Sequence, residues 1–460
     1  MNDVNDGSSP QDRCPIKHAT PLYGEEFERD PSQIYAHLRR NYEKVAPVML
    51  EPGVPGWLVV DYTTLVAISR DPVTWSHDSR LWKDWAEGHV PDSSGLLPMM
   101  MWRPNLLFAD GEEHIRLRRA VSESLDRIDQ QRLGRDIRAL ANGLIDRFSA
   151  SGRADLVSDY ARLLPLLVFN RLFGLGDQEG YRLMAALTGI WDGADAERAN
   201  ADFERYMGDL IALKRREPGS DIPSWLMEHR ADLSDEELLH QLVIIIGAGN
   251  EPTCNLIGNA MRLLLTDREF GADLTSSRLP VEDAIDRVLW LDTPMANYPF
   301  VYPRADVQLG EVTVPAGAAV GFGLAAANQS IVEKYGDQLA VSGNRAHVSF
   351  GAGPHRCPAQ DLAHQISAIG ITAVINRLGG LRLTVPAEDL SWRSSLFARA
   401  LETLPVEFTA HPPLEESEPV WQTTESSSPP TTMSTNKRPR SERAAGSSLW
   451  SSLVRLVRGR

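Results

Sequence analysis

The chain has 460 residues, of which 42% are hydrophobic and 24% charged, a composition typical of globular proteins rather than of fibrous or disordered ones. The 47 Lys and Arg residues against 62 Asp and Glu residues give a net charge of -15, which excludes broad electrostatic binding to nucleic acid or to an anionic membrane. The three cysteines, Cys14, Cys254 and Cys357, are too few for a disulfide framework or a four-cysteine zinc site.

The N-terminal segment, residues 1–20, is polar and is expected to be a flexible lead. It lacks the apolar core of a signal peptide. No apolar run in the chain approaches the roughly 20 residues needed to span a bilayer. Together with the few cysteines, this predicts a cytoplasmic protein.

The predicted elements begin with a helix that opens at Pro31 behind an Asp30 cap, followed by a β-hairpin within residues 47–60. Helical periodicity then dominates, with predicted helices at residues 114–125, 130–149, 157–173, 196–216, 234–265 and 281–291. Strand signals return at residues 307–314, and a last helix is predicted over about 358–378. The order favours a mainly α fold with small β-sheets, of the α+β class.

The C-terminal part changes in composition. Residues 413–446 are rich in Ser, Thr, Pro and Glu and are expected to form a disordered linker. Residues 447–460 place apolar and basic side chains on opposite sides of a short helix, a pattern that occurs at membrane surfaces and protein interfaces. A basic tail that contacts nothing is an equal alternative.

The strongest chemical signal is the segment 350–360, Phe-Gly-Ala-Gly-Pro-His-Arg-Cys-Pro-Ala-Gln, which runs directly into the last predicted helix. Gly351 and Gly353 permit positive φ and a close approach of the backbone to a ligand. Pro358 suits a first helical turn, so Cys357 is predicted at a helix N-terminus, where the dipole and free amides favour a thiolate. Such a sulfur is an axial metal ligand or a nucleophile; a buried structural cysteine is the simpler alternative.

These residues resemble a known family. Phe350, Gly353, His355 and Cys357 match the haem-binding loop of the cytochrome P-450 haem-thiolate monooxygenases. The resemblance implies a cytochrome P-450 catalytic domain over residues 21–412. It also implies haem b between an oxygen-binding helix and the Cys-ligand helix, with Cys357 as the iron ligand whose thiolate favours O–O cleavage.

A second match to the family lies at residues 110–119. His114 and Arg118 are four residues apart and share one helix face, which suits two donors that grip one carboxylate. The resemblance assigns them, with His355, to the haem propionates. The family's usual propionate arginine aligns with Val301, and the nearby Arg304 is the candidate that replaces it.

A third match is the long helix through residues 242–253, which resembles the oxygen-binding helix of the family. Ala248 and Gly249 are the small residues expected over the haem, and Glu251 is the acid expected in proton delivery. Pro252 stands where the family has a threonine and cannot donate a hydrogen bond. Thr253 is the next hydroxyl, about 100° further round the helix, and it is the second catalytic candidate, with an ordered water as the alternative for proton delivery.

The Glu-x-x-Arg motif of the family is missing. Its two positions align with Arg287 and Trp290, and the arginine that completes the network in the family is hard to find within residues 335–344. One unpaired buried charge is costly. Because the glutamate and the arginine of the motif are both missing, we predict that apolar packing replaces the charged network.

The resemblance implies a monooxygenase that inserts one oxygen atom from O₂ into a hydrophobic, natural-product-like molecule, with electrons from a separate ferredoxin and its reductase. The substrate pocket would draw on four segments: residues 82–102, the helices around Ile190 and Trp191, Gly247 with Ala248, and residues 295–300. The aromatic and methionine side chains of residues 82–102 equally suit plain packing of the loop.

The rival hypothesis is a haem-binding sensor or scaffold without oxygenase activity. In that hypothesis the protein docks to a membrane or a protein partner through residues 447–460. Pro252 and the missing Glu-x-x-Arg motif favour it. Coupled consumption of NAD(P)H with formation of product would separate the two hypotheses.

Overall fold

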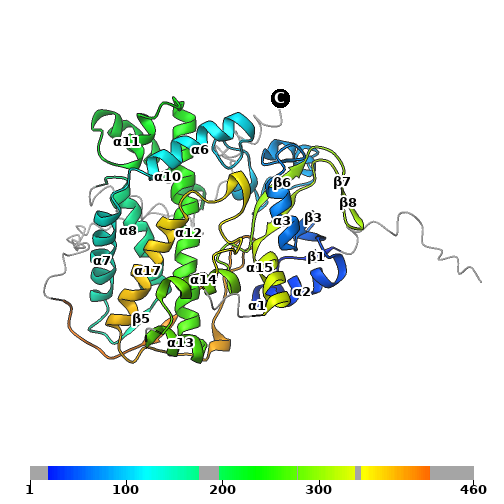
Figure 1. The fold of residues 1–460 in the computed structure, drawn as a ribbon. Coiled ribbons are helices and arrows are strands. Elements are labelled where there is room, and N and C mark those ends of the chain that lie inside the picture. Colours follow the sequence, from blue (N-terminus) through cyan, green and yellow to red (C-terminus); the bar gives the residue numbers. More distant parts are fainter. Residues whose placement is uncertain (1–18, 176–195, 277, 337–342, 415–460) are drawn as a thin grey trace, which may run out of the picture.

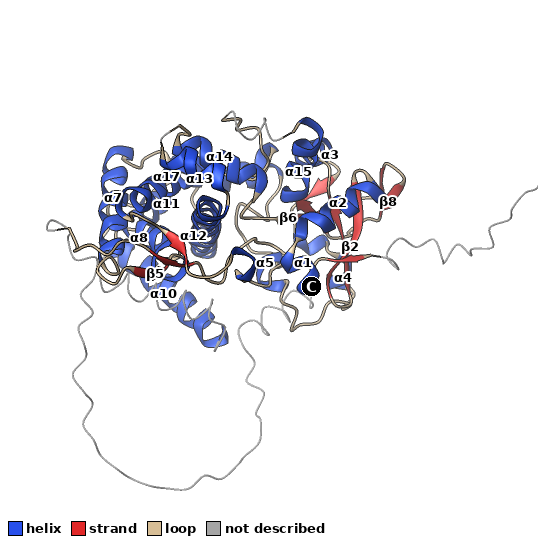
Figure 2. Cartoon of the chain, turned by 90° about the horizontal axis from the view of Figure 1, so that it is seen from below, coloured by secondary structure: helices blue, strands red, loops and turns tan. Residues whose placement is uncertain are grey.

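The computed structural model describes residues 19–175, 196–276, 278–336 and 343–414. Most helices gather on one side of the molecule, and the largest sheet lies on the other side together with a few further helices (Figure 1). The long helix α12 (Asp235–Thr266) runs through the helical part. The same division is visible from below (Figure 2). The predicted α+β class is therefore confirmed. The predicted tail at 447–460, residues 415–446 of the linker predicted at 413–446, and Ile190 and Trp191 lie outside the described residues.

The α-helices are α1 (Glu25–Arg29), α2 (Pro31–Tyr42), α3 (Tyr62–Ser69), α4 (Lys83–Ala86), α5 (Leu97–Met100), α6 (Gly111–Leu125), α7 (Gln130–Asp146), α8 (Leu163–Leu172), α10 (Ala196–Arg216), α11 (Ile222–Met227), α12 (Asp235–Thr266), α13 (Arg268–Thr275), α14 (Val281–Leu291), α15 (Leu324–Tyr335) and α17 (Gln360–Arg377). Single turns of other helix types are η2 (Ser79–Leu81), η3 (Val157–Ala161), η4 (Gly353–His355) and η5 (Ala387–Asp389).

The largest sheet has six strands in the order β1 (Thr20–Pro21), β2 (Val45–Glu51), β3 (Val54–Val59), β9 (Val320–Gly323), β6 (Asn297–Pro303) and β4 (Trp75–Ser76). A three-stranded sheet is formed by β10 (Arg382–Leu383), β11 (Pro405–Glu407) and β5 (Arg153–Asp155). The strands β7 (Val307–Leu309) and β8 (Val312–Val314) form a hairpin. The β4–β6 pairing matters most for the site, because it brings residues near 76 beside residues near 303.

Most predicted elements are confirmed within three residues at each end, and three need correction. The predicted helix over 157–173 is a π-helical turn, Val157–Ala161, followed by α8. The predicted strand over 307–314 is the β7–β8 hairpin, turning at Gly310 with a φ of +66°. The last helix begins at Gln360 rather than at Pro358, so Cys357 precedes it by three residues.

The long helix α12 organises the helical part. Its N-terminus is closed by a capping box, in which Ser234 and Glu237 satisfy each other's backbone N–H groups. Buried apolar side chains of α12, α8 and α17 belong to one core cluster, which also includes α7 and α14. None of the helices in the described part of the chain is both long and apolar enough to cross a membrane.

Candidate active site

The segment between Val348 and Cys357 folds back on itself through backbone hydrogen bonds. The N–H of Gly351 donates to the Val348 carbonyl at 2.7 Å, and the N–H of Cys357 donates to the Phe350 carbonyl at 2.8 Å. Gly351 and Gly353 adopt φ values of +72° and +66°, the left-handed conformation predicted from their sequence. The loop is thereby closed into a defined shape ahead of α17.

Gly353 is required for a second reason. A Cβ atom built on it would overlap the carbonyl oxygen of Ser69, at the end of α3. The Cys loop therefore lies directly against α3, backbone to backbone, and any side chain at position 353 would push the two segments apart.

The Cys357 sulfur lies in a half-buried position and accepts a hydrogen bond from the Ala359 N–H at 3.4 Å. Burial raises the pKa of this thiol, while the Ala359 N–H and the positive charges of Arg118 and Arg356 act in the opposite direction. The Ala359 N–H is a free amide of the kind that the sequence predicted to favour the thiolate, and it acts against desolvation. A cation bound to the sulfur favours the thiolate form.

Three histidine rings stack beside the Cys loop. The ring of His355 lies between the other two, with its centroid 3.5 Å from that of His77 and 3.9 Å from that of His114. Burial lowers the pKa of His114 to about 4 and that of His355 well below its usual value, helped by the neighbouring positive groups. The rings of His114 and His355 are therefore neutral at pH 7, and each then has one N–H to donate.

The histidine cluster also has unused polar atoms. His77 Nε2, His114 Nε2 and His355 Nδ1 are buried and have no hydrogen-bond partner among the described residues. Arg118 reaches the same loop, where its guanidinium donates to the Pro354 carbonyl at 3.4 Å. His114, Arg118 and His355, which the sequence singled out separately, are thus brought together at the Cys loop.

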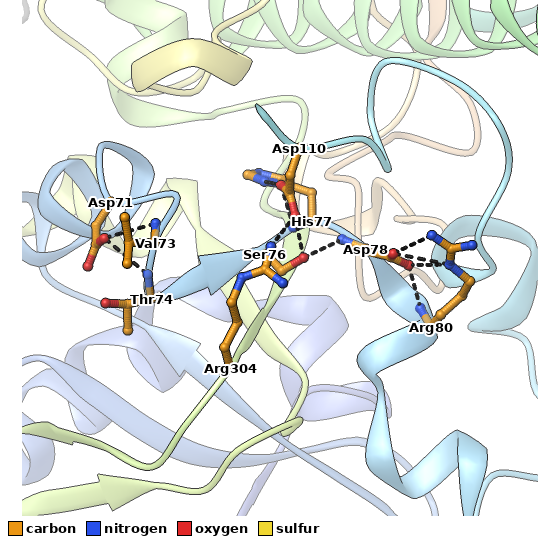
Figure 3. Close-up of polar contacts among 9 residues, drawn as sticks. All are labelled: Asp71, Val73, Thr74, Ser76, His77, Asp78, Arg80, Asp110 and Arg304. Carbon is orange, nitrogen blue, oxygen red and sulfur yellow. Dashed lines mark hydrogen bonds and ion pairs between the residues drawn. The ribbon is translucent and has the colours of Figure 1, made fainter. Parts of the chain in front are cut away.

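Arg304 is held by an acid next to this cluster (Figure 3). Its guanidinium lies 2.9 Å from Asp110, which also accepts hydrogen bonds from the Ser76 hydroxyl and, at 3.1 Å, from the His77 N–H. Burial alone would raise the pKa of Asp110, but hydrogen bonds from His77 and Ser76 lower it to about 2. Arg304 is exposed, and its charge is already balanced by Asp110.

Sequence reasoning missed His77. The residue directly follows β4, and only the pairing of β4 with β6 brings it to Arg304 and the Cys loop. No local motif around residue 77 signals this position. Asp110 was part of the matched segment, but its contacts with Ser76 and Arg304 depend on the same long-range pairing.

The middle of α12 presents small residues. Gly247 and Ala248 are exposed although they lie at the centre of a 32-residue helix, so this stretch borders an open space inside the fold. Gly249 faces α8, where a Cβ atom would overlap the Phe169 ring. Thr253 is buried and donates to the Gly249 carbonyl at 2.6 Å. That bond uses the only proton of its hydroxyl group.

Glu251 forms an ion pair with Arg393 and accepts a 3.4 Å hydrogen bond from Asn255. The two charged groups line a small cavity together with Arg162 and Cys254. Cys254 itself is buried, and burial raises its pKa well above the usual value, so it is an inert thiol. Arg393 was not predicted, because it lies 142 residues from its partner.

The expected pocket residues divide into two groups. Trp82, Trp85 and Met101 are buried in the core cluster of the sheet region. This agrees with the alternative that these side chains pack the loop rather than line a pocket. A small cavity next to His77 is lined by methionine, aromatic and proline side chains: Met99, Met100, Leu107, Phe108, Tyr298, Pro299, Phe300 and Tyr302. The predicted segments 82–102 and 295–300 thus both contribute to one apolar space.

The missing Glu-x-x-Arg motif is not replaced by apolar packing alone, and that prediction is wrong in part. Trp290 is buried, but its indole N–H donates to the Asn344 carbonyl at 2.7 Å. Beside it, the fully buried Asp286 accepts a 3.0 Å hydrogen bond from Arg345. The Asp286–Arg345 pair therefore connects α14 with the segment before the Cys loop. Asp286 stands one residue before the first position of the missing motif, Arg287.

Comparison with known proteins supports the resemblance. The chain is 30% identical over 402 residues to cytochrome P450 107B1 of Saccharopolyspora erythraea, covering 84% of this chain and 96% of that protein. It is also 30% identical to the cytochrome P450 monooxygenase PikC of Streptomyces venezuelae and to the vitamin D(3) 25-hydroxylase of Pseudonocardia autotrophica, covering 83% and 84% of this chain and 92% and 95% of those proteins. No protein-family model matches the chain.

Solved structures agree. CYP154C4 from Streptomyces sp. ATCC 11861 superposes with a TM-score of 0.78 at 27% identity, covering 85% of this chain and 98% of that one. CYP154A1 from Streptomyces coelicolor gives a TM-score of 0.73 at 28% identity, covering 85% of this chain and 100% of that one. The chain therefore belongs to the cytochrome P450 monooxygenase family, as a divergent relative of its bacterial members that lacks the Glu-x-x-Arg motif and the oxygen-helix threonine.

Proposed function

We propose that this P450 holds haem b and inserts one oxygen atom from O₂ into a hydrophobic, natural-product-like molecule, with electrons from a separate ferredoxin and its reductase. The observation that carries the proposal is the meeting of Cys357, His114, His355 and Arg118 at one loop, although they come from segments more than 230 residues apart.

The residues at this loop suit a haem. A haem has two propionate carboxylates, and the buried, unpartnered nitrogens of His114 and His355 are donors of the kind that carboxylates need. Arg118 adds a permanent positive charge; burial lowers its pKa, and the nearby Cys357 opposes that shift. A single cysteine in a closed loop supplies the thiolate expected of a P450.

In this proposal Cys357 ligates the iron, Phe350 and Gly353 shape its loop, and His114, Arg118 and His355 hold the propionates. When bound, the haem would supply O₂ reduction and the transfer of one oxygen atom to the substrate, with the second atom leaving as water. Arg304 acts more indirectly, because its partner Asp110 holds the backbone of His77. Ala248 leaves room above the haem because its side chain is small, whereas the sequence-predicted role of Gly249 over the haem is not retained, since this glycine faces Phe169 of α8.

Reduction of the second oxygen atom to water needs two protons. In our proposal these protons are supplied along α12. Glu251 is half-exposed, so its carboxylate contacts solvent while it is paired with Arg393, and in the proposal it is the acid that relays protons from there. Pro252 has no N–H to donate to the carbonyl of Ala248, which is therefore a free acceptor at the exposed part of the helix. An ordered water on this carbonyl takes the place of the threonine hydroxyl. Thr253 supports the helix through its bond to Gly249.

The substrate class rests on the apolar lining of the cavity next to His77, where Met99, Met100, Tyr298 and Phe300 meet. Flexible methionines and aromatic rings fit hydrophobic molecules of varied shape. Curated relatives with names that state a substrate include the vitamin D(3) 25-hydroxylase and the mycinamicin IV hydroxylase/epoxidase of Micromonospora griseorubida.

External electron donors, a separate ferredoxin and its reductase, are proposed from the resemblance to the family. We retain residues 21–412 as the catalytic domain and the cytoplasm as the location. Contact of residues 447–460 with a membrane or a protein remains a prediction.

The test is turnover with a surrogate ferredoxin, its reductase and NAD(P)H, against a panel of steroids, macrolides and fatty acids under ¹⁸O₂. We expect a binding-induced spin-state shift with at least one compound and a product that carries one ¹⁸O atom. NAD(P)H oxidation that yields only peroxide or water across the panel, with haem fully loaded, would instead support the sensor hypothesis.

A further inference from the structure

A second group of metal-type ligands is formed by residues other than Cys357 and the three stacked histidines. Asp286 of α14, His347 of the segment before the Cys loop and His364 of α17 converge, with all their ligand atoms within 4.8 Å of one another. Asp286 is completely buried, His347 is 7% exposed and His364 is half-buried. The three come from different elements, so the fold itself brings them together.

The distances do not fit hydrogen bonds. Asp286 Oδ1 lies 3.6 Å from His347 Nε2 and 3.4 Å from His364 Nε2, beyond the usual range for an N–H donor. Asp286 Oδ1 and both ring nitrogens of His347 are buried without any hydrogen-bond partner among the described residues. Leaving such groups unsatisfied is costly, so an unaccounted ligand is indicated.

The two distances from Asp286 Oδ1 to the histidine nitrogens fit a tetrahedral metal site. Ligand atoms bound to zinc at about 2.0–2.1 Å in a tetrahedron are about 3.3 Å apart. Two imidazoles and one carboxylate are a donor set that zinc and other divalent transition metals accept. Arg345 donates to Asp286 Oδ2 at 3.0 Å, which orients the carboxylate and leaves Oδ1 for the ion.

We propose that Asp286 Oδ1, His347 Nε2 and His364 Nε2 bind one zinc ion, with water as the fourth ligand. The ion cross-links α14, the segment before the Cys loop and the first turns of α17. The Phe350 ring lies 5.9 Å from that of His347 and 5.6 Å from that of His364, so the cross-link supports the loop that carries Cys357. Zinc binding is independent of the proposed oxygenase activity.

Stoichiometry gives the first test. The full-length holoprotein is equilibrated with zinc sulfate, passed through gel filtration and analysed for zinc by mass spectrometry, while haem iron is counted separately. We expect about one zinc per chain in the wild type and in the control His37→Ala, an exposed histidine of α2, and close to none in His364→Ala or Asp286→Asn. Equal zinc in His364→Ala and the wild type, or no bound zinc in the wild type, would overturn the proposal.

A second measurement needs no variant. Zinc K-edge X-ray absorption on the loaded wild type should show only nitrogen and oxygen ligands at about 2.0–2.1 Å, with the outer-shell scattering of two imidazoles. A sulfur shell at about 2.3 Å would place the zinc on a cysteine and reject the site. A zinc-loaded sample that lacks haem would contradict the proposed function and leave this site standing.

Discussion

At the scale of single residues, the Cys loop depends on backbone conformations that only particular side chains permit. Gly353 combines a φ of +66° with a Cβ direction that points into the Ser69 carbonyl. The motif made this glycine predictable, since a glycine there was expected to allow close backbone approach. Its partner, Ser69, was not predictable, because α3 lies nearly 300 residues earlier in the chain.

Gly353→Ala is therefore expected to lower the free energy of unfolding by about 1–3 kcal/mol, since both strain and overlap must be relieved. Urea unfolding followed by circular dichroism measures the change. The matched control is Gly208→Ala in α10, which has ordinary φ and nothing within 4 Å of the added Cβ. It should be neutral or stabilising by about 0.5–1 kcal/mol. Equal effects of the two substitutions would contradict the role of Gly353.

Asp110 gives a second prediction at this scale. Its pKa is lowered to about 2 in the folded protein, so its stabilising contribution is fully present above the unfolded value of 3.8 and is lost as the pH falls from there toward about 2. Asp110→Asn should cost about 1.5–3 kcal/mol because hydrogen bonds to a charged group are lost. The cost should be the same at pH 5 and pH 8.

The exposed Glu311→Gln, in the β7–β8 hairpin, is the control and should change stability by less than about 0.5 kcal/mol. If the cost of Asp110→Asn shrank markedly between pH 8 and pH 5, Asp110 would have a raised pKa, and its contacts with Ser76 and His77 would be misassigned.

At the scale of elements, α12 carries the most unusual feature, a proline in the middle of a 32-residue helix. The helix continues past Pro252 because apolar packing against α8 and α17 stabilises it more than one lost hydrogen bond destabilises it. The helix was predictable from its long periodic pattern, whereas the Glu251–Arg393 ion pair was not, since Arg393 lies in a loop after α17.

Pro252→Ala restores the N–H that the Ala248 carbonyl lacks. We expect the variant to be more stable by about 1–3 kcal/mol and to form less product per NAD(P)H, because the acceptor for the proposed water is lost. Thermal unfolding and product-to-NAD(P)H ratios measure both effects. A stabilised variant with unchanged coupling would exclude the Ala248 carbonyl from proton delivery.

Glu251→Gln keeps the shape of the side chain and removes its proton exchange. We expect the rate of product formation to fall by about 10²-fold or more, with the reduced carbon monoxide spectrum unchanged. Glu123→Gln, which alters an exposed ion-pair cluster on α6, should have no effect on the rate. A rate for Glu251→Gln equal to that of this control would remove Glu251 from the mechanism.

At the scale of the whole molecule, the sequence predicted what is local and missed what is brought together by the tertiary fold. The loop 350–357 and the helix faces of His114 and Arg118 follow from short-range spacing. His77 reaches the site through the β4–β6 pairing, and Asp286, His347 and His364 meet only because α14 and α17 pack together. The apolar replacement expected for the Glu-x-x-Arg motif is wrong in part for this reason, since Arg345 pairs with Asp286 across 59 residues.

At this scale the central claim is that Cys357 ligates haem iron as a thiolate. Absorption spectroscopy of the purified full-length protein, reduced with dithionite and exposed to carbon monoxide, tests it most directly. We expect a strongly red-shifted Soret band in the wild type, and its loss in Cys357→Ser. An unshifted band in haem-loaded wild type, or the same red-shifted band in Cys357→Ser, would contradict the claim.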